Sequence, residues 1–410
     1  MKDACGVTPR RTVSPLKGLM NLRITRRDFL KTVGLGIAGS VTADKLFAGV
    51  RIPAISGGAE LFVGTYTGGK SEGIYRCLFD VKSGELNVES VTKGVANPSF
   101  LAIDRNRSRL FCVNETAEFE GKPGGSVSAF ALNPGTGDLR LLNSSSTHGA
   151  GPCYLTIDSH GRFVLAANYT GGSLAVLPIR DDGSLGEATD VAQHKGSSVK
   201  PRQQGPHAHS IILDPSGQHA YAADLGLDKV MIYRFDDQQG KLLPATPAWA
   251  RLKPGAGPRH LAFSPDGSAI YVINELDSTV TAFSVDKSTG SLEPRQTLST
   301  VPPDFGGENF AADIHLARSG RFVYASNRGH DSIAVFAVDS NKGDISWLQH
   351  KSTGGKWPRN FTIDPTGQHL LVANQRSDTI TVFDIDAESG TLAPNGHMVE
   401  VPSPVCLKFL

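Results

Sequence analysis

The sequence has almost no net charge. Its 41 Lys and Arg residues against 40 Asp and Glu residues leave a formal charge of +1 over 410 residues. A protein that binds nucleic acid or a membrane surface through bulk electrostatics carries a marked basic excess, which this chain lacks. We therefore expect no nucleic acid and no charged membrane surface among its partners.

Cysteine is scarce and widely dispersed. The five cysteines stand at positions 5, 77, 112, 153 and 406, and no two of them have the spacing of a zinc site or a redox motif. We expect small hydrophobic side chains or free thiols rather than a disulfide framework.

Long hydrophobic runs are also missing. The apolar stretch at residues 33–43 is shorter than the ~20 residues that a permanent membrane-spanning helix needs, so we expect no stable insertion into a membrane. It follows the string TRRDFLK at residues 25–31, in which tandem arginines precede a short apolar region, as in an export signal. The string resembles a twin-arginine (Tat) signal, which implies that the Tat translocase exports the protein already folded. We expect residues 1–48 to be this leader, with cleavage after Ala48, and a periplasmic or other extracytoplasmic location.

Helical periodicity is absent beyond residue 60, which excludes a helical solenoid, and a repeat of about fifty residues takes its place. Each copy has an apolar run ending in Asn or Asp, then a polar break, then an alternating strand. The anchors at the ends of the apolar runs are Asn114, Asn168, Asp224, Asn274, Asn327 and Asn374, with Gly64 in a weaker first copy.

Turn chemistry divides each copy into four strands. Strings such as DPSG, SPDG and DPTG combine a proline that presets φ with a glycine that accepts positive φ. The flanking segments, for example HLAFS, AIYVINE, TVTAFSV and LEPRQTL, alternate with the period of two that is typical of strands. The sequence therefore predicts an all-β fold in which residues 49–410 form one seven-bladed β-propeller with four antiparallel strands per blade.

The last residues should close the ring. The first copy begins at its second strand, and the C-terminal string SPVCLKF resembles the inner strands that begin NPSFL and GPCYL. We expect the C-terminus to supply the missing inner strand of the first blade, which would leave no unpaired inner edge.

Side chains from distant copies are expected to meet at one mouth of the central channel. In an antiparallel blade, the start of the first strand and the end of the second lie at the same end of the sheet. Residues fifteen before and one after each anchor should therefore face this mouth. The pairs are Ser99 with Glu115, Cys153 with Tyr169, His209 with Leu225, Arg259 with Glu275, Ala312 with Arg328, and Arg359 with Gln375. They are flanked by His207, His260, Asp313, His315, Asn327 and Asn360.

The chemistry of these residues indicates a site for an anionic ligand. Arginines around one opening present planar forks of donors that suit anionic groups. Histidine and glutamate beside them can move protons near neutral pH. The alternative is that Arg259 and Glu275 form only a structural pair between strand ends.

A metal site is the weaker interpretation of the same region. His207 and His209 are two residues apart, so in an extended strand their imidazoles would share a face. No second group of ligands with diagnostic spacing accompanies them. We therefore expect no metal and no other cofactor.

Several strings together resemble the seven-bladed lactonase family, which includes bacterial 6-phosphogluconolactonase and fungal carboxy-cis,cis-muconate cyclase. These strings are GPHAHS, GPRHLAFSPDG, YVINEL, YASNRG and PRNFTIDPTGQHLLVANQ, and the resemblance covers about residues 60–410. It implies a single propeller without a required metal and a site at the channel mouth. The catalytic positions that carry over are His209, Arg259, Glu275 and Arg328.

The implied reaction is hydrolysis of a sugar-type lactone, anionic or polyhydroxylated, to the open-chain acid. His209 or Glu275 would activate water, and Arg259 or Arg328 would stabilise the developing oxyanion. The substrate-binding residues would be His207, His260, His315, Asn327, Arg359 and Gln375. Two features depart from the family pattern: the first blades are less regular, and the leader would separate the protein from cytoplasmic 6-phosphogluconolactone.

Two other functions remain open on the sequence. The strings YVINELDSTVTAF and LLVANQRSDTITVF also resemble YVTN-type repeats of surface and periplasmic propellers, which need no catalytic role. A lactonising cyclisation of the muconate type would use the same anion-binding residues. A calcium-dependent six-bladed lactonase fits less well, because the repeat occurs seven times.

Overall fold

The computed structural model describes residues 58–106, 108–133 and 135–410. The predicted leader, its cleavage site and the boundary at residue 48 lie outside these residues. Within the described part, no helix is long and apolar enough to cross a membrane.

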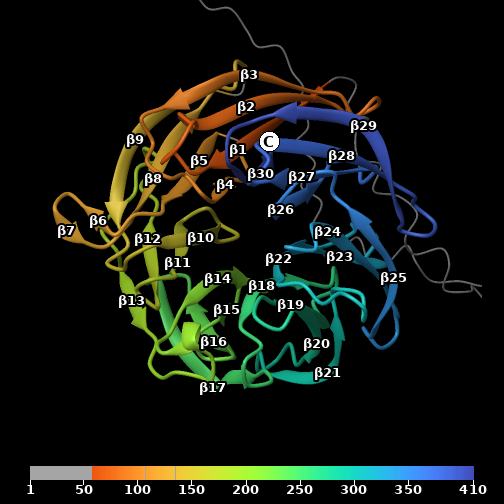
Figure 1. Cartoon of the computed structure of the whole chain (residues 1–410). Coiled ribbons are helices and arrows are strands. Elements are labelled where there is room, and N and C mark those ends of the chain that lie inside the picture. The colour runs from red at the N-terminus through yellow and green to blue at the C-terminus, as the bar shows by residue number, and fades with distance from the viewer. Residues whose placement is uncertain (1–57, 107, 134) are drawn as a thin grey trace, which may run out of the picture. The chain divides into compact units, whose positions relative to one another are not determined.

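Seven four-stranded antiparallel sheets surround a central axis as the blades of a propeller, which confirms the predicted fold (Figure 1). From the inner to the outer strand, blade 1 is β30 (Pro404–Phe409), β1 (Gly58–Thr65), β2 (Gly73–Asp80) and β3 (Leu86–Lys93). Blade 2 is β4 (Leu101–Ile103), β5 (Arg109–Asn114), β8 (Ser126–Leu132) and β9 (Leu139–Ser146), with a hairpin of β6 (Glu118–Phe119) and β7 (Lys122–Pro123) between β5 and β8. Blade 3 is β10 (Pro152–Ile157), β11 (Phe163–Asn168), β12 (Ser173–Pro178) and β13 (Asp190–Gln193).

The later blades repeat the same order. Blade 4 is β14 (Ala208–Leu213), β15 (His219–Asp224), β16 (Lys229–Asp236) and β17 (Lys241–Arg251), preceded by the short 3₁₀ helix η3 (Pro201–Gln203). Blade 5 is β18 (Pro258–Phe263), β19 (Ala269–Asn274), β20 (Thr279–Val285) and β21 (Leu292–Ser299). Blade 6 is β22 (Phe310–Leu316), β23 (Phe322–Arg328), β24 (Ser332–Val338) and β25 (Ile345–Ser352). Blade 7 is β26 (Pro358–Ile363), β27 (His369–Asn374), β28 (Thr379–Ile385) and β29 (Leu392–Glu400).

The two ends of the described chain meet in blade 1. β30 pairs antiparallel with β1, and the register places Leu61 opposite Phe409 and Val63 opposite Leu407. The C-terminal strand therefore supplies the inner strand of the first blade, as the sequence predicts.

The hydrophobic core lies between the blades rather than within any one of them. One cluster joins Leu165 and Val176 of blade 3 to Ile211, Ala222 and Phe235 of blade 4. Similar clusters join the other neighbouring blades, including blade 7 with blade 1. Each buried aliphatic or phenyl side chain contributes about 1.5–3 kcal/mol, so a blade depends on its neighbours for most of its stability.

The anchor residues have a structural purpose that explains why they recur. Each is buried at the end of the second strand of its blade. Asn274, for example, donates from Nδ2 to Thr279 Oγ1 at 2.8 Å and to Thr281 Oγ1 at 3.0 Å on the next strand. The anchors thus fix the hairpins at one end of every blade.

The prediction of Gly64 as the first anchor is wrong by one residue. Thr65 pairs with Pro404 in the register that Asn274 shares with Pro258 in blade 5. The position that follows the anchor in blade 1 is therefore Tyr66. The repeat is obscured here because threonine replaces Asn or Asp.

Candidate active site

A β-bulge in the inner strands turns the predicted mouth residues out of the sheet. In β18 the register shifts between Pro258 and His260, which leaves Arg259 unpaired. The same shift leaves His209 unpaired in β14 and Arg359 unpaired in β26. A bulge re-aims the side chain of its extra residue, so these residues are free to face the mouth. In β22 the irregularity spans two residues, Ala312 and Asp313.

Glu275 joins three arginines from different parts of the chain. Its Oε2 lies 3.0 Å from Arg259 Nε and 2.7 Å from Arg328 Nη2, and its Oε1 lies 2.8 Å from Arg202 Nη2. The Arg259 contact is an ion pair without hydrogen-bond alignment. The side chains of Arg259, Glu275 and Arg328 are only 2–5% exposed, whereas that of Arg202 is 46% exposed. Arg202 therefore lies at the rim and the other two arginines lie below it.

The arginines keep Glu275 ionised. Burial alone would raise the pKa of this carboxyl, but Arg328, Arg259 and Arg202 outweigh burial and lower the pKa to about 2. Burial in turn lowers the pKa of Arg328 to about 9 although Glu275 opposes the change. At neutral pH the group is thus a carboxylate surrounded by guanidinium ions.

Arg259 and Arg328 each retain a donor that none of the described residues accepts from. Arg259 donates from Nη1 to the carbonyl of Ala312 and to His260 Nε2 at 3.2 Å. Arg328 donates from Nε and Nη2 to the carbonyls of Phe310 and Ala311. Among the described residues, Arg259 Nη2 and Arg328 Nη1 have no acceptor, so both are available to a ligand.

His209 is buried beside this group. Its Nδ1 lies 3.7 Å from Cys153 Sγ, and its ring makes edge contacts with Tyr169 and His260. Burial, followed by the charge of Arg259, lowers the pKa of His209 well below its usual value. The imidazole is therefore neutral, and its Nε2 forms no hydrogen bond with the described residues.

A second polar layer lies beneath the mouth. His260 Nδ1 donates to Asp313 Oδ1 at 2.7 Å, and His315 Nε2 donates to Asp313 Oδ2 at 3.0 Å. Asn360 Nδ2 also donates to Asp313 Oδ2. Both ring nitrogens of His260 are occupied, and burial together with Arg259 lowers its pKa to about 3. This layer fixes the imidazole that accepts from Arg259.

The remaining predicted residues are His207, Arg359, Gln375 and Asn327. His207 stacks on Tyr169 with ring centroids 4.6 Å apart and donates from Nδ1 to the carbonyl of Tyr169 at 2.9 Å. Arg359 lies in β26, and Gln375 directly follows β27. Asn327 does not join the site, because its amide is hydrogen-bonded to Thr300 and Asn309 of the segment between β21 and β22.

The sequence interpretation missed two residues of this region. Arg202 lies within η3, in the segment before blade 4, and no repeat position corresponds to it. Tyr66 was missed because the first anchor was assigned to Gly64, one residue too early. A repeat alignment that accepts Thr65 as an anchor would have found Tyr66 but not Arg202.

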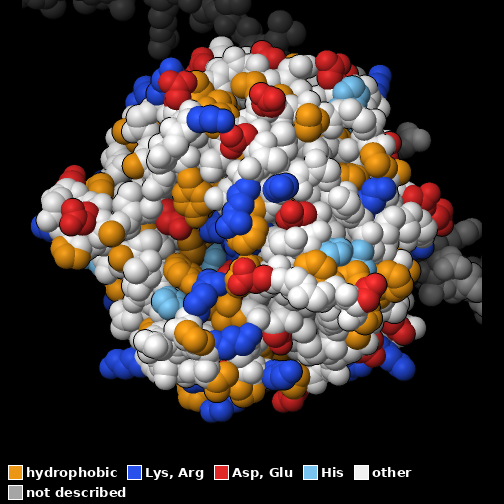
Figure 2. Space-filling view, viewed as in Figure 1, with side chains coloured by type: hydrophobic (Ala, Val, Ile, Leu, Met, Phe, Trp, Pro, Cys, Tyr) orange, Lys and Arg blue, Asp and Glu red, His pale blue; other side chains and the backbone are white. Residues whose placement is uncertain are grey.

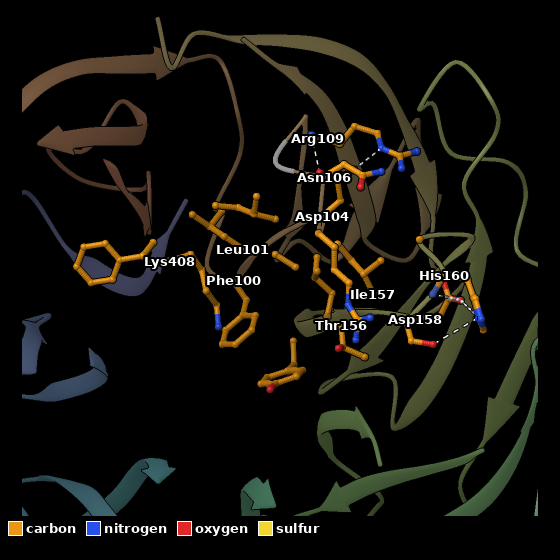
Figure 3. Close-up of a pocket in the computed structure, with 18 residues that line it drawn as sticks. Phe100, Leu101, Asp104, Asn106, Arg109, Thr156, Ile157, Asp158, His160 and Lys408 are labelled. Atoms are coloured by element: carbon orange, nitrogen blue, oxygen red, sulfur yellow. Dashed lines mark hydrogen bonds and ion pairs between the residues drawn. The ribbon is translucent and has the colours of Figure 1, made fainter. Parts of the chain in front are cut away.

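The mouth is strongly charged. Figure 2 shows Lys and Arg side chains gathered around a hollow near the centre of one face. A separate cavity of about 440 Å³ is lined by the inner strands of blades 2 and 3, from Phe100 and Tyr154 to the turns at Asp104 and Asp158 (Figure 3). It contains none of His209, Arg259, Glu275 and Arg328. Residues 58–106, 108–133 and 135–410 contain no group of three or more His, Cys, Asp or Glu side chains arranged to hold a metal ion.

Comparison with known proteins places this propeller in a family. Residues 60–409 match the family described as lactonase, 7-bladed beta-propeller, and the chain belongs to it. The 6-phosphogluconolactonase of Bacillus subtilis (strain 168) is 37% identical over 349 residues, which are 85% of this chain and 97% of that protein. The 6-phosphogluconolactonase of Formosa agariphila is 35% identical over 76% of this chain and 88% of that protein. The solved structure of a periplasmic gluconolactonase from Pseudomonas aeruginosa is 38% identical, with a TM-score of 0.82 over 86% of this chain and 99% of that chain.

Proposed function

We propose that the protein hydrolyses a sugar-type lactone to the open-chain acid at the mouth of the propeller. The observation that carries this proposal is a neutral imidazole, His209, within range of the charge of Arg259, which with Arg328 is one of two buried guanidinium groups that each retain a donor unused by the described residues. Membership of the lactonase family, and relatives that are named 6-phosphogluconolactonase and gluconolactonase, support an enzyme over a non-catalytic binding propeller.

His209 is the better candidate for the general base. A general base needs an unoccupied lone pair that can reach the proton of the attacking water. Glu275 has a pKa of about 2 and both of its oxygens are in contact with arginines, so its affinity for a proton is low. His209 has an unoccupied Nε2 that can accept the proton of a water molecule as that water attacks the lactone carbonyl.

Arg259 and Arg328 would then stabilise the oxyanion. As the tetrahedral intermediate forms, negative charge develops on the former carbonyl oxygen, and a donor already in place lowers the barrier. Arg259 Nη2 and Arg328 Nη1 are such donors. Glu275 holds both guanidinium groups in position, and when the ring C–O bond breaks, the proton on His209 can pass to the leaving alkoxide.

The direct test uses Glu275→Gln and Arg259→Ala with glucono-1,5-lactone and its 6-phosphate as substrates. Loss of one oxyanion donor typically costs about 100- to 1000-fold in kcat, so we expect a fall of that size, measured by pH-stat after spontaneous hydrolysis is subtracted. Glu293→Gln, an exposed change on β21, is the matched control and should keep wild-type turnover. Normal turnover by folded Arg259→Ala would remove this residue from the mechanism.

We further propose that residues 1–48 direct Tat-dependent export and that the enzyme acts in the periplasm. The support is the TRRDFLK string and the similarity to a gluconolactonase that is named as periplasmic. A lactonase in that compartment would meet aldonolactones formed outside the cytoplasm.

A further inference from the structure

Arg359 differs from the other arginines of the mouth. Arg202, Arg259 and Arg328 each form an ion pair with Glu275. Arg359 instead donates from Nη2 to the neutral hydroxyl of Tyr66 at 2.9 Å, and it forms no ion pair with a carboxylate of the described residues. Its charge is therefore not balanced by a direct partner.

The carboxylate that contacts Tyr66 accepts hydrogen bonds from two hydroxyl groups. Tyr66 donates to Glu115 Oε2 at 2.9 Å, and Ser99 donates to the same oxygen. Because the Tyr66 proton points to Glu115, the lone pairs of its oxygen face Arg359. The guanidinium also lies over the Tyr66 ring, 5.4 Å from the centroid. Tyr66 and Glu115 thus orient Arg359 without neutralising it.

Arg359 belongs to the same site as the Glu275 group. Its charge contributes to the low pKa values of Glu275 and Arg259, which places it within electrostatic range of both. Four guanidinium groups stand here against the carboxylates of Glu275, Glu115 and the underlying Asp313, and the site retains a positive excess. Gln375, whose backbone N–H donates to the carbonyl of Trp357 two residues before Arg359, has a buried Oε1 with no hydrogen-bond donor within the described part of the chain.

We propose that Arg359, oriented by Tyr66 and Glu115, binds an anionic substituent of the lactone and determines a preference for acidic over neutral lactones. This inference rests on the proposed function. A phosphate or carboxylate group would receive the guanidinium fork, and a neighbouring hydroxyl of the substrate would donate to Gln375 Oε1. The lactone carbonyl would then lie toward Arg259 and Arg328.

The experiment compares kcat and KM for three lactones. Glucono-1,5-lactone 6-phosphate carries a phosphate, D-glucaro-1,4-lactone carries a free carboxylate, and glucono-1,5-lactone is neutral. Hydrogen bonds to charged groups are worth about 10- to 100-fold in binding. We expect Arg359→Ala to lower kcat/KM by that factor for at least one acidic lactone, mainly through KM, and by less than about threefold for the neutral one. Whichever acidic lactone is affected identifies the anionic group.

Three further variants separate a role in anion binding from a merely structural role. Arg359→Lys keeps the charge and should restore part of the loss. Arg376→Ala removes a rim charge that stacks on Trp357 and should leave the ratio of acidic to neutral kcat/KM unchanged. Tyr66→Phe should raise KM for the affected acidic lactone, whereas a merely structural role would lower thermal stability without changing that ratio. An equal fall for all three lactones in Arg359→Ala, or no fall, would overturn the inference.

Binding of inorganic phosphate, measured by calorimetry, distinguishes failure of this inference from failure of the proposed function. If wild-type protein hydrolyses none of the lactones but binds phosphate, and Arg359→Ala does not, the lactonase proposal fails and the anion site stands. If the lactones are hydrolysed and Arg359→Ala keeps both phosphate binding and selectivity, the inference about Arg359 fails alone.

Discussion

Single side chains at the mouth are held in place by opposed charges. Arg259 is buried and would be costly as an isolated cation, but Glu275 compensates part of its charge and the carbonyl of Ala312 accepts from it. Removing one partner of a buried ion pair typically costs about 3–5 kcal/mol, because the other charge is left uncompensated. Variants of Glu275 therefore need a check of folding by circular dichroism beside the measurement of turnover.

The pH dependence of the enzyme follows from two shifted groups. The pKa of His209 lies well below its usual value and that of Glu275 is about 2, so both remain in their basic forms as the pH falls from 8 to 6.5. We expect kcat/KM to change less than about twofold over this interval, with the acid limb below pH 6.5. The measurement is a pH profile with the neutral lactone. An acid limb centred at or above pH 6.5 would contradict a buried, neutral His209.

At the scale of elements, a turn in blade 4 secures the segment that carries Arg202. Asp228 lies between β15 and β16 with φ of 52°, a backbone conformation that Asp tolerates better than most residues. Its carboxylate accepts from Gly255 N and Gly257 N at 2.7 Å each and from Gln203 Nε2 at 2.7 Å. It thus ties η3 to the strand that begins just before Arg259.

Substitution of Asp228 should destabilise the protein measurably. Each buried donor left without an acceptor costs about 1–3 kcal/mol, and alanine adds strain at positive φ. We expect Asp228→Ala to lower the free energy of unfolding by about 3–5 kcal/mol and Asp228→Asn by about 1–3 kcal/mol, from urea denaturation. Asp304→Ala, at an exposed position, should change it by less than about 0.5 kcal/mol. A loss for Asp228→Ala no larger than this control would show that the turn does not hold the segment.

At the scale of the whole propeller, closure by β30 makes the first and last blades interdependent. The mouth needs this closure, because Tyr66 follows β1 in blade 1 while its partner Arg359 comes from blade 7. The two residues are 293 positions apart in the sequence. A site that combines them can exist only when the ring is complete.

The export proposal has its own test. Replacing Arg26 and Arg27 together by lysine should abolish a twin-arginine signal while leaving the propeller unchanged. We expect full-length protein in the periplasm of a Tat-competent bacterium for the wild type and retention in the cytoplasm for the double variant, by fractionation and immunoblot. Equal periplasmic amounts of both would contradict Tat-dependent export.

Much of this architecture could be predicted because it is periodic. The anchors, the turn glycines and the alternating strands specify four strands per blade, seven blades and the closing strand. They also placed His209, Arg259, Glu275 and Arg328 at one mouth, because each copy repeats the same register. Asn327 was predicted as a site residue from its place in the chain, yet its amide is hydrogen-bonded to Thr300 between β21 and β22.

The chain's local pattern thus settles which strands form, in what order, and which positions turn toward the channel, since these depend on hydrophobic period and turn chemistry. It does not settle how the charges pair. Arg202 reaches Glu275 from a non-repeating segment, and Arg359 is left with Tyr66 rather than a carboxylate. Such pairings depend on distances of a few ångströms between residues far apart in sequence, and only the closed ring brings those residues together.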